Sequence, residues 1–102
     1  MNGAGVRVLL PSLLRDMIGA SGEITVDVPA PVTQASLIDV IEARYPMLRG
    51  TIRDHGTLKR RPFIRLFACQ EDLSFALAEA TLPEEVVRGA EPLLIVGAMA
   101  GG

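Results

Sequence analysis

The sequence ends in Leu93-Leu94-Ile95-Val96-Gly97-Ala98-Met99-Ala100-Gly101-Gly102, and the rest of the chain is organised around this stretch. The apolar run at 93–96 predicts a buried strand. The six residues after it are small and uncharged, and only Met99 has a side chain of any size. Because glycine lacks a Cβ atom, the Gly101-Gly102 backbone can enter spaces too narrow for other residues. We expect 97–102 to be a flexible tail, at most about 20 Å long, that can place its carboxylate inside another protein; the alternative is a frayed chain end.

The composition predicts one cytoplasmic domain spanning residues 1–102. The net charge of −2 gives no reason to expect nucleic acid as a partner. A single cysteine, Cys69, excludes an internal disulfide, a cysteine-based zinc site and an iron–sulfur cluster, and it fits a reducing compartment. The apolar run from Val6 to Leu14 is interrupted by Arg7 and Pro11 and is too short to span a membrane.

The first strand is predicted at Val6–Leu10, because this stretch is apolar and β-branched and Pro11 ends it. Met1–Gly5 is expected to be a loose leader. Ser12–Gly22 is expected to be a connection that folds back onto the core through its apolar side chains, which are Leu13, Leu14, Met17 and Ile18.

The next stretch, Glu23–Val28, alternates between polar and apolar residues, which predicts a half-buried strand paired with the first one in a hairpin. Its inward residues are Ile24, Val26 and Val28.

A helix is predicted at Gln34–Arg44, with Thr33 or Ser36 as its cap. Pro46 ends the helix. The apolar residues Leu37, Ile38, Ile41 and Tyr45 fall on one helical stripe.

The third strand is predicted at Phe63–Ala68, with Ile64, Leu66 and Ala68 facing the helix. A turn follows at Cys69–Asp72. Leu73–Thr81 fits either a short strand followed by a loop or a helical turn. Leu82–Arg88 suits a short helical turn, because proline and acidic residues favour a helix start.

This order of elements predicts an α+β fold, in which one main helix crosses one face of a mixed sheet of four to five strands. The first and last strands would then lie side by side in the centre. The tail would leave from the middle of the sheet.

The whole stretch from Val6 to Gly102 resembles the ubiquitin-like β-grasp sulfur-carrier family. This family includes the molybdopterin synthase small subunit, the thiamine-pathway carrier and a carrier of an alternative cysteine pathway. The segments that carry the resemblance are Leu10-Pro11-Ser12, Leu14-Arg15, Leu37–Pro46, Glu71-Asp72 and Ala100-Gly101-Gly102.

The resemblance implies a carrier protein rather than an enzyme, with no catalytic residue, metal or cofactor of its own. An ATP-dependent activating enzyme would adenylate Gly102, and sulfur would replace AMP to give a thiocarboxylate, with Gly101 providing clearance. A biosynthetic enzyme would accept the sulfur. The alternatives are a ubiquitin-like modifier joined through its glycine to a lysine, and a subunit that stays bound to a larger synthase.

A docking surface on the sheet would help to hold such a partner. The candidates lie on the faces opposite the predicted inward residues, although strand alternation alone leaves open that they fill the core instead. They are Phe63, Phe67, Leu94 and Val96, together with Met99 in the tail.

Other reactive residues give weaker signals. A catalytic pair of His55 and Cys69 would need spatial contact, and a solvated loop histidine and a small buried thiol are the expected alternatives. The acidic pairs Glu71-Asp72 and Glu84-Glu85 are expected in solvated turns. Lys59-Arg60-Arg61 is either a solvated face or a docking patch for an acidic groove.

Overall fold

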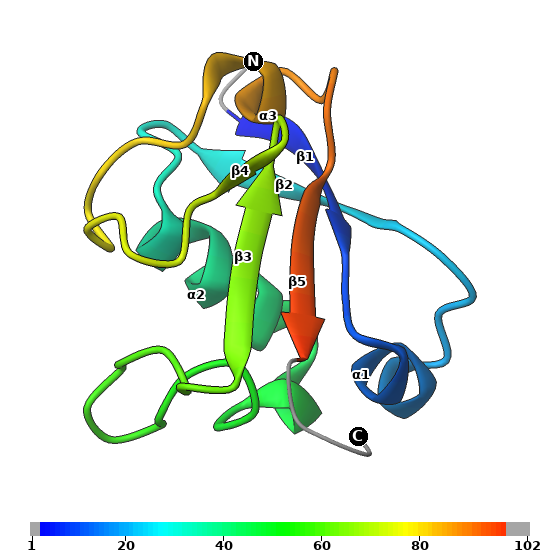
Figure 1. The fold of residues 1–102 in the computed structure, drawn as a ribbon. Coiled ribbons are helices and arrows are strands. Elements are labelled where there is room, and N and C mark those ends of the chain that lie inside the picture. The colour runs from blue at the N-terminus through cyan, green and yellow to red at the C-terminus, as the bar shows by residue number, and fades with distance from the viewer. Residues whose placement is uncertain (1–2, 98–102) are drawn as a thin grey trace.

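A computed structural model describes residues 3–97 of the chain. These residues form a five-stranded sheet in the order β2-β1-β5-β3-β4, in which β1 and β5 are parallel and the other neighbours are antiparallel. Figure 1 shows α2 lying across one face of this sheet. The elements are β1 (Gly3–Leu9), α1 (Ser12–Ile18), β2 (Ile24–Pro29), α2 (Gln34–Arg44), η1 (Pro46–Leu48), β3 (Ile64–Ala68), β4 (Glu71–Asp72), α3 (Glu84–Val87) and β5 (Leu93–Gly97).

The core lies between α2 and the sheet, and strand alternation fills it as expected. Alternate residues of β2 and β3 are buried, and these are the predicted inward sets. From α2, Leu37, Ile38 and Ile41 complete the packing. The α+β class, the hairpin of β1 with β2 and the central position of β1 and β5 are all confirmed.

The helix α2 begins and ends where the sequence predicted. Thr33 is its N-cap in a capping box: the Ser36 amide donates to Thr33 Oγ1 at 3.0 Å, and the Thr33 amide donates to Ser36 Oγ at 2.9 Å. Two amides of the first turn that lack helical partners are thereby satisfied. At the other end, Pro46 is the first residue of the separate 3-10 turn η1.

Two predictions about the N-terminal region are wrong. Residues 3–5 are not a leader, because β1 pairs with β2 from Gly3 opposite Pro29 onward. The segment after Pro11 forms the helix α1, and only one side of it faces the core. Leu14 is buried and Ile18 is packed against the core, whereas Leu13 and Met17 are exposed. The reason is helical geometry, since residues four apart share a face.

The structure also settles two ambiguous stretches. Residues 73–81 form turns rather than a strand or a helix, apart from an isolated bridge between Thr33 and Thr81. Glu71-Asp72 is a very short edge strand opposite Phe67 and Ala68 rather than a plain turn. The short helical turn expected before the last strand is confirmed as α3.

The turn between α3 and β5 is fitted closely against β1. Gly89 has a φ of +80°, and a Cβ atom added to it would lie 2.8 Å from the carbonyl oxygen of Gly5. Arg7 on β1 fixes the same turn by donating from Nη1 to the Gly89 carbonyl at 3.0 Å, while it pairs with Glu23 at 2.9 Å. The close contact of this turn with β1 therefore requires a glycine at position 89.

We expect Gly89→Ala to destabilise the protein more than Gly19→Ala does. Gly19 also has a positive φ of +72° but has open space around its Cα, so alanine there costs only the backbone strain of about 1–2 kcal/mol. The clash with Gly5 should add at least about 1 kcal/mol at Gly89. Urea unfolding of both variants measures the difference, and equal losses would show that the close approach is not a constraint.

Candidate functional site: a groove at the end of the central strand

The central strand β5 delivers the chain to one end of the sheet. It lies between β1 and β3, and its last residue, Gly97, is exposed. The predicted tail residues Met99, Gly101 and Gly102 lie outside the described residues 3–97, so their roles stay predictions. The structure does show that the chain reaches this point on a strand that pairs with β1 up to Leu94 and with β3 up to Gly97.

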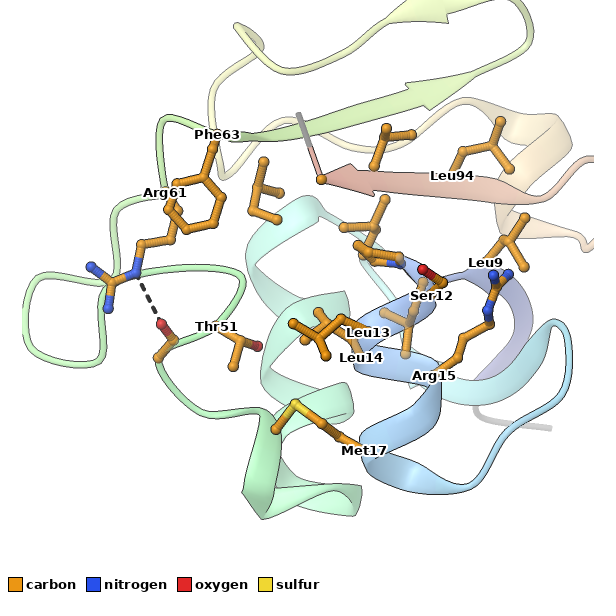
Figure 2. A pocket seen from close by; sticks show the side chains of 17 residues that line it. Leu9, Ser12, Leu13, Leu14, Arg15, Met17, Thr51, Arg61, Phe63 and Leu94 are labelled. Atoms are coloured by element: carbon orange, nitrogen blue, oxygen red, sulfur yellow. Dashed lines mark hydrogen bonds between the residues drawn. The ribbon is translucent and has the colours of Figure 1, made fainter. Parts of the chain in front are cut away.

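A groove of about 660 Å³ lies beside Gly97. Three parts of the chain form its walls: α1 with the residues before it, the segment 50–64, and the end of β5 (Figure 2). The lining residues are Leu9, Leu10, Pro11, Ser12, Leu13, Leu14, Arg15, Met17, Gly50, Thr51, Arg61, Phe63, Ile64, Leu94, Ile95, Val96 and Gly97.

The groove gathers apolar side chains that are open to solvent. Leu13 is 68% exposed and Met17 42%, Val96 40% and Phe63 37%. These are half of the eight large hydrophobic residues that are exposed within the described part of the chain. A contiguous exposed apolar surface of this kind is typical of a protein–protein contact.

The docking residues predicted on the sheet are placed on the outer face, as expected. Phe63, Leu94 and Val96 line the groove, and Phe67 lies outside it but pairs in register with Leu94. Phe67 and Leu94 are half-buried, whereas the residues that alternate with Leu94, Leu93 and Ile95, are fully buried. Their part in docking stays a prediction.

Sequence reasoning missed the contribution of α1. Leu13 and Met17 were expected to turn inward, yet they form one wall of the groove. The sequence does carry a signal for this wall in the adjacent apolar pairs Leu13-Leu14 and Met17-Ile18. Adjacent residues point to different sides of a helix, so a short helix that packs against one neighbour cannot bury both members of each pair. One residue of each pair must face solvent or a partner.

The segment 50–64, which forms the second wall, is anchored to α2 by a buried arginine. The side chain of Arg53 is 7% exposed and donates to Glu42, with Nη2 3.0 Å from Oε1, and to Asp39. Nearby, Arg61 Nε donates to the Gly50 carbonyl at 2.9 Å (Figure 2). The wall is therefore held in place before any partner arrives.

A second set of contacts shapes the turn inside this segment. Asp54 Oδ1 accepts the amide protons of Thr57 at 2.7 Å and of Gly56 at 2.8 Å, and these hydrogen bonds lower the pKa of the Asp54 carboxyl. Arg60 donates to the Ser74 carbonyl at 3.2 Å and lies over the ring of Phe75. Arg60, from the predicted basic stretch Lys59-Arg60-Arg61, therefore binds the protein itself, as Arg53 does.

The weaker catalytic candidates do not form a site. His55 lies near Gly50 at the start of β3, and Cys69 follows the end of the same strand, so they are at opposite ends of it. Burial, together with the charges of Glu85, Glu91 and Glu71, raises the pKa of the Cys69 thiol and keeps it neutral near pH 7.

Of the acidic pairs, Asp72 has local partners. Asp72 accepts from the Ser74 amide at 2.8 Å and from Arg65 at 2.8 Å; the Ser74 hydrogen bonds and the Arg65 charge lower the pKa of the Asp72 carboxyl. Within residues 3–97, His, Cys, Asp and Glu side chains form no group of three suited to a metal ion. The same residues contain no helix that is long and apolar enough to cross a bilayer.

Comparison with known proteins places this geometry in a class. No protein-family model matches the sequence, and no curated protein sequence is significantly similar to it. Solved structures do match. A chain of the Amycolatopsis orientalis BexX/CysO complex is 26% identical with a TM-score of 0.71, over 95% of this chain and 99% of that one.

Two archaeal structures match over similar lengths. The small archaeal modifier protein 1 of Methanosarcina acetivorans is 19% identical with a TM-score of 0.73, over the whole of both chains. SAMP1 from Haloferax volcanii is 18% identical with a TM-score of 0.70, over 94% of this chain and 97% of that one. The chain therefore has the β-grasp fold of the ubiquitin-like proteins. The resemblance to the β-grasp sulfur-carrier family is confirmed by these neighbours.

We expect the wall at 50–64 to depend on Glu42 much more than on Asp39, although both carboxylates bind Arg53. The Glu42 side chain is 9% exposed and that of Asp39 is 62% exposed. Breaking a buried pair costs about 3 kcal/mol or more, whereas an exposed pair contributes less than about 1 kcal/mol. Denaturant unfolding of Glu42→Gln and Asp39→Asn tests this, and a larger loss for Asp39→Asn would contradict it.

Proposed function

We propose that the protein is a sulfur carrier, in which the C-terminal carboxylate of Gly102 is converted to a thiocarboxylate that then donates its sulfur. The observation that carries this proposal is the position of β5. An interior strand, held on both sides, ends at the exposed Gly97 and leads into Ala-Met-Ala-Gly-Gly. The likeness to a chain of the complex that contains CysO, a sulfur carrier, supports the same assignment.

The chemistry requires activation, because a carboxylate is a poor electrophile. The activating enzyme would join the Gly102 carboxylate to the α-phosphate of ATP and release pyrophosphate. Hydrosulfide would then attack the carbonyl carbon, so that a C–S bond forms and the C–O bond to AMP breaks. In this scheme ATP belongs to the activating enzyme, and the present protein is a co-substrate rather than a catalyst.

The terminal glycines suit this chemistry for a steric reason. The two enzymes that handle the tail must each surround its carbonyl group with catalytic residues. Because Gly101 and Gly102 have no side chains, the backbone can pass through a narrow channel to reach them. The enzyme that accepts the sulfur would belong to the biosynthesis of molybdopterin, thiamine or cysteine.

A modifier function is the second candidate, and the likeness to the two small archaeal modifier proteins favours it. In this case the activated glycine would form an amide with a lysine of a target protein. Lys59 is the only lysine of the chain and it is exposed, so conjugates of the protein with itself would all be linked there. A third candidate, a subunit bound permanently to a larger synthase, would show itself by stable co-purification with that subunit.

Intact mass spectrometry distinguishes carriage from modification. The purified protein is incubated with the adenylating enzyme of its own organism, ATP and a sulfide source. Replacement of one oxygen by sulfur at the C-terminus supports carriage, whereas adducts on lysine support modification. An unchanged mass with an enzyme that is shown to be active would reject both.

We expect the addition of one alanine after Gly102 to abolish adenylation without unfolding the domain. The added residue moves the reactive carboxylate away from the position that the enzyme recognises and replaces the terminal glycine. The control is one alanine inserted after Met1, which should be adenylated normally. Pyrophosphate release measures the reaction, and adenylation of the extended, uncleaved chain would contradict the proposal.

A further inference from the structure

The groove beside Gly97 has charged residues as well as apolar ones in its lining. Of the described residues that line it, Arg15 and Arg61 are charged and none is acidic. Figure 2 shows these two arginines on opposite sides of the groove, with Arg15 extending from α1 toward Leu9. The groove is thus an apolar surface with an arginine at each of two rims.

The two arginines are not equivalent. Arg61 Nη1 lies 3.5 Å from Asp54 Oδ2, and Arg61 Nε donates to the Gly50 carbonyl. The charge of Arg61 is therefore partly compensated within the protein. For Arg15, by contrast, no side-chain hydrogen bond or ion pair is found within residues 3–97, and its side chain is half-exposed. Arg15 is therefore the group in the groove that is available to a carboxylate.

The distance to the end of the chain limits which protein can fill the groove. Five residues separate Gly97 from the end of Gly102. Fully extended, five residues span at most about 17 Å. An enzyme that takes the Gly102 carboxylate into its active site must therefore have part of its surface within that distance of the groove.

We propose that the groove binds an acidic, apolar segment of the activating enzyme, with a carboxylate at Arg15 and apolar side chains between α1 and Phe63. This inference rests on the proposed function for the identity of the partner. A symmetric pair of copies is a poorer occupant, because its groove offers no carboxylate to Arg15 among the described lining residues. The apolar contact supplies affinity, and the charge selects acidic over basic segments.

Peptide binding to the full-length protein tests the proposal without the enzyme. The probes are the capped pentapeptides Glu-Leu-Phe-Leu-Glu and Lys-Leu-Phe-Leu-Lys, and the readout is the chemical shifts of the isotopically labelled protein. We expect saturable shifts at Leu13, Met17 and Val96 with the acidic peptide. The lysine peptide should bind roughly fivefold more weakly, as expected for the loss of one exposed ion pair.

Two charge-reversal variants sharpen the test. Arg15→Glu should reverse the preference between the two peptides, whereas Arg88→Glu should leave it unchanged, because Arg88 follows α3 and does not line the groove. Both residues have side chains that reach solvent, so both variants should fold. Equal binding of the two peptides, or shifts confined to another face, would overturn the proposal.

Two other occupants give distinct results. If deletion of residues 98–102 shifts the signals of Leu13 and Met17, the chain's own tail fills the groove and the proposal is wrong. If those signals depend on protein concentration, a second copy fills it and the proposal is equally wrong. Acidic peptide binding without any thiocarboxylate formation in the mass assay would keep the groove assignment and reject the carrier function.

Discussion

The parallel pairing of β1 with β5 is the constraint on which the rest of the structure depends. Val8 pairs with Leu93 and Leu9 with Leu94, although nearly the whole chain lies between them. Parallel neighbours cannot be joined by a tight turn, so the intervening chain must cross the face of the sheet, and α2 does so. The consequence is that the last strand is an interior strand, paired with β1 as far as Leu94 and with β3 as far as Gly97, which lies opposite Ile64.

The groove follows from the same pairing. Because β1 and β5 are parallel, both finish at the same end of the sheet, and α1 begins there after Pro11. A Cβ atom on Gly97 would lie 3.7 Å from the Pro11 side chain. Because β3 is antiparallel to β5, it starts at this end, with Ile64 opposite Gly97. The segment that precedes β3 is therefore brought to the same place, and three distant parts of the chain surround the end of β5.

The local patterns of the sequence were sufficient for most of the fold. Alternation located the inward residues of β2 and β3, and the capping residue Thr33 with Pro46 bounded α2. The local patterns were insufficient where tertiary contacts determine which residues are buried or paired. Whether Leu13 and Met17 face the core depends on how many neighbours α1 has, and the pairing of residues 3–5 depends on the length of β2. The outward position of Phe63, Leu94 and Val96 was predictable, but the groove was not, because it needs the convergence of three segments.

If residues 98–102 enter an enzyme as proposed, the energetics of their ordering give the groove a use. Ordering the five residues 98–102 costs about 5–10 kcal/mol, at about 1–2 kcal/mol each. Main-chain hydrogen bonds to an enzyme return only about 0.5–1.5 kcal/mol apiece. Burying a large apolar side chain contributes about 1.5–3 kcal/mol, so the exposed portions of Leu13, Met17, Phe63 and Val96, roughly half of each, supply about 3–6 kcal/mol together. The apolar contact would therefore offset more than half of the ordering cost and leave the remainder to the main-chain hydrogen bonds. In the proposed function, the side chains around the groove would thus provide the affinity that a terminal segment with almost no side chains lacks.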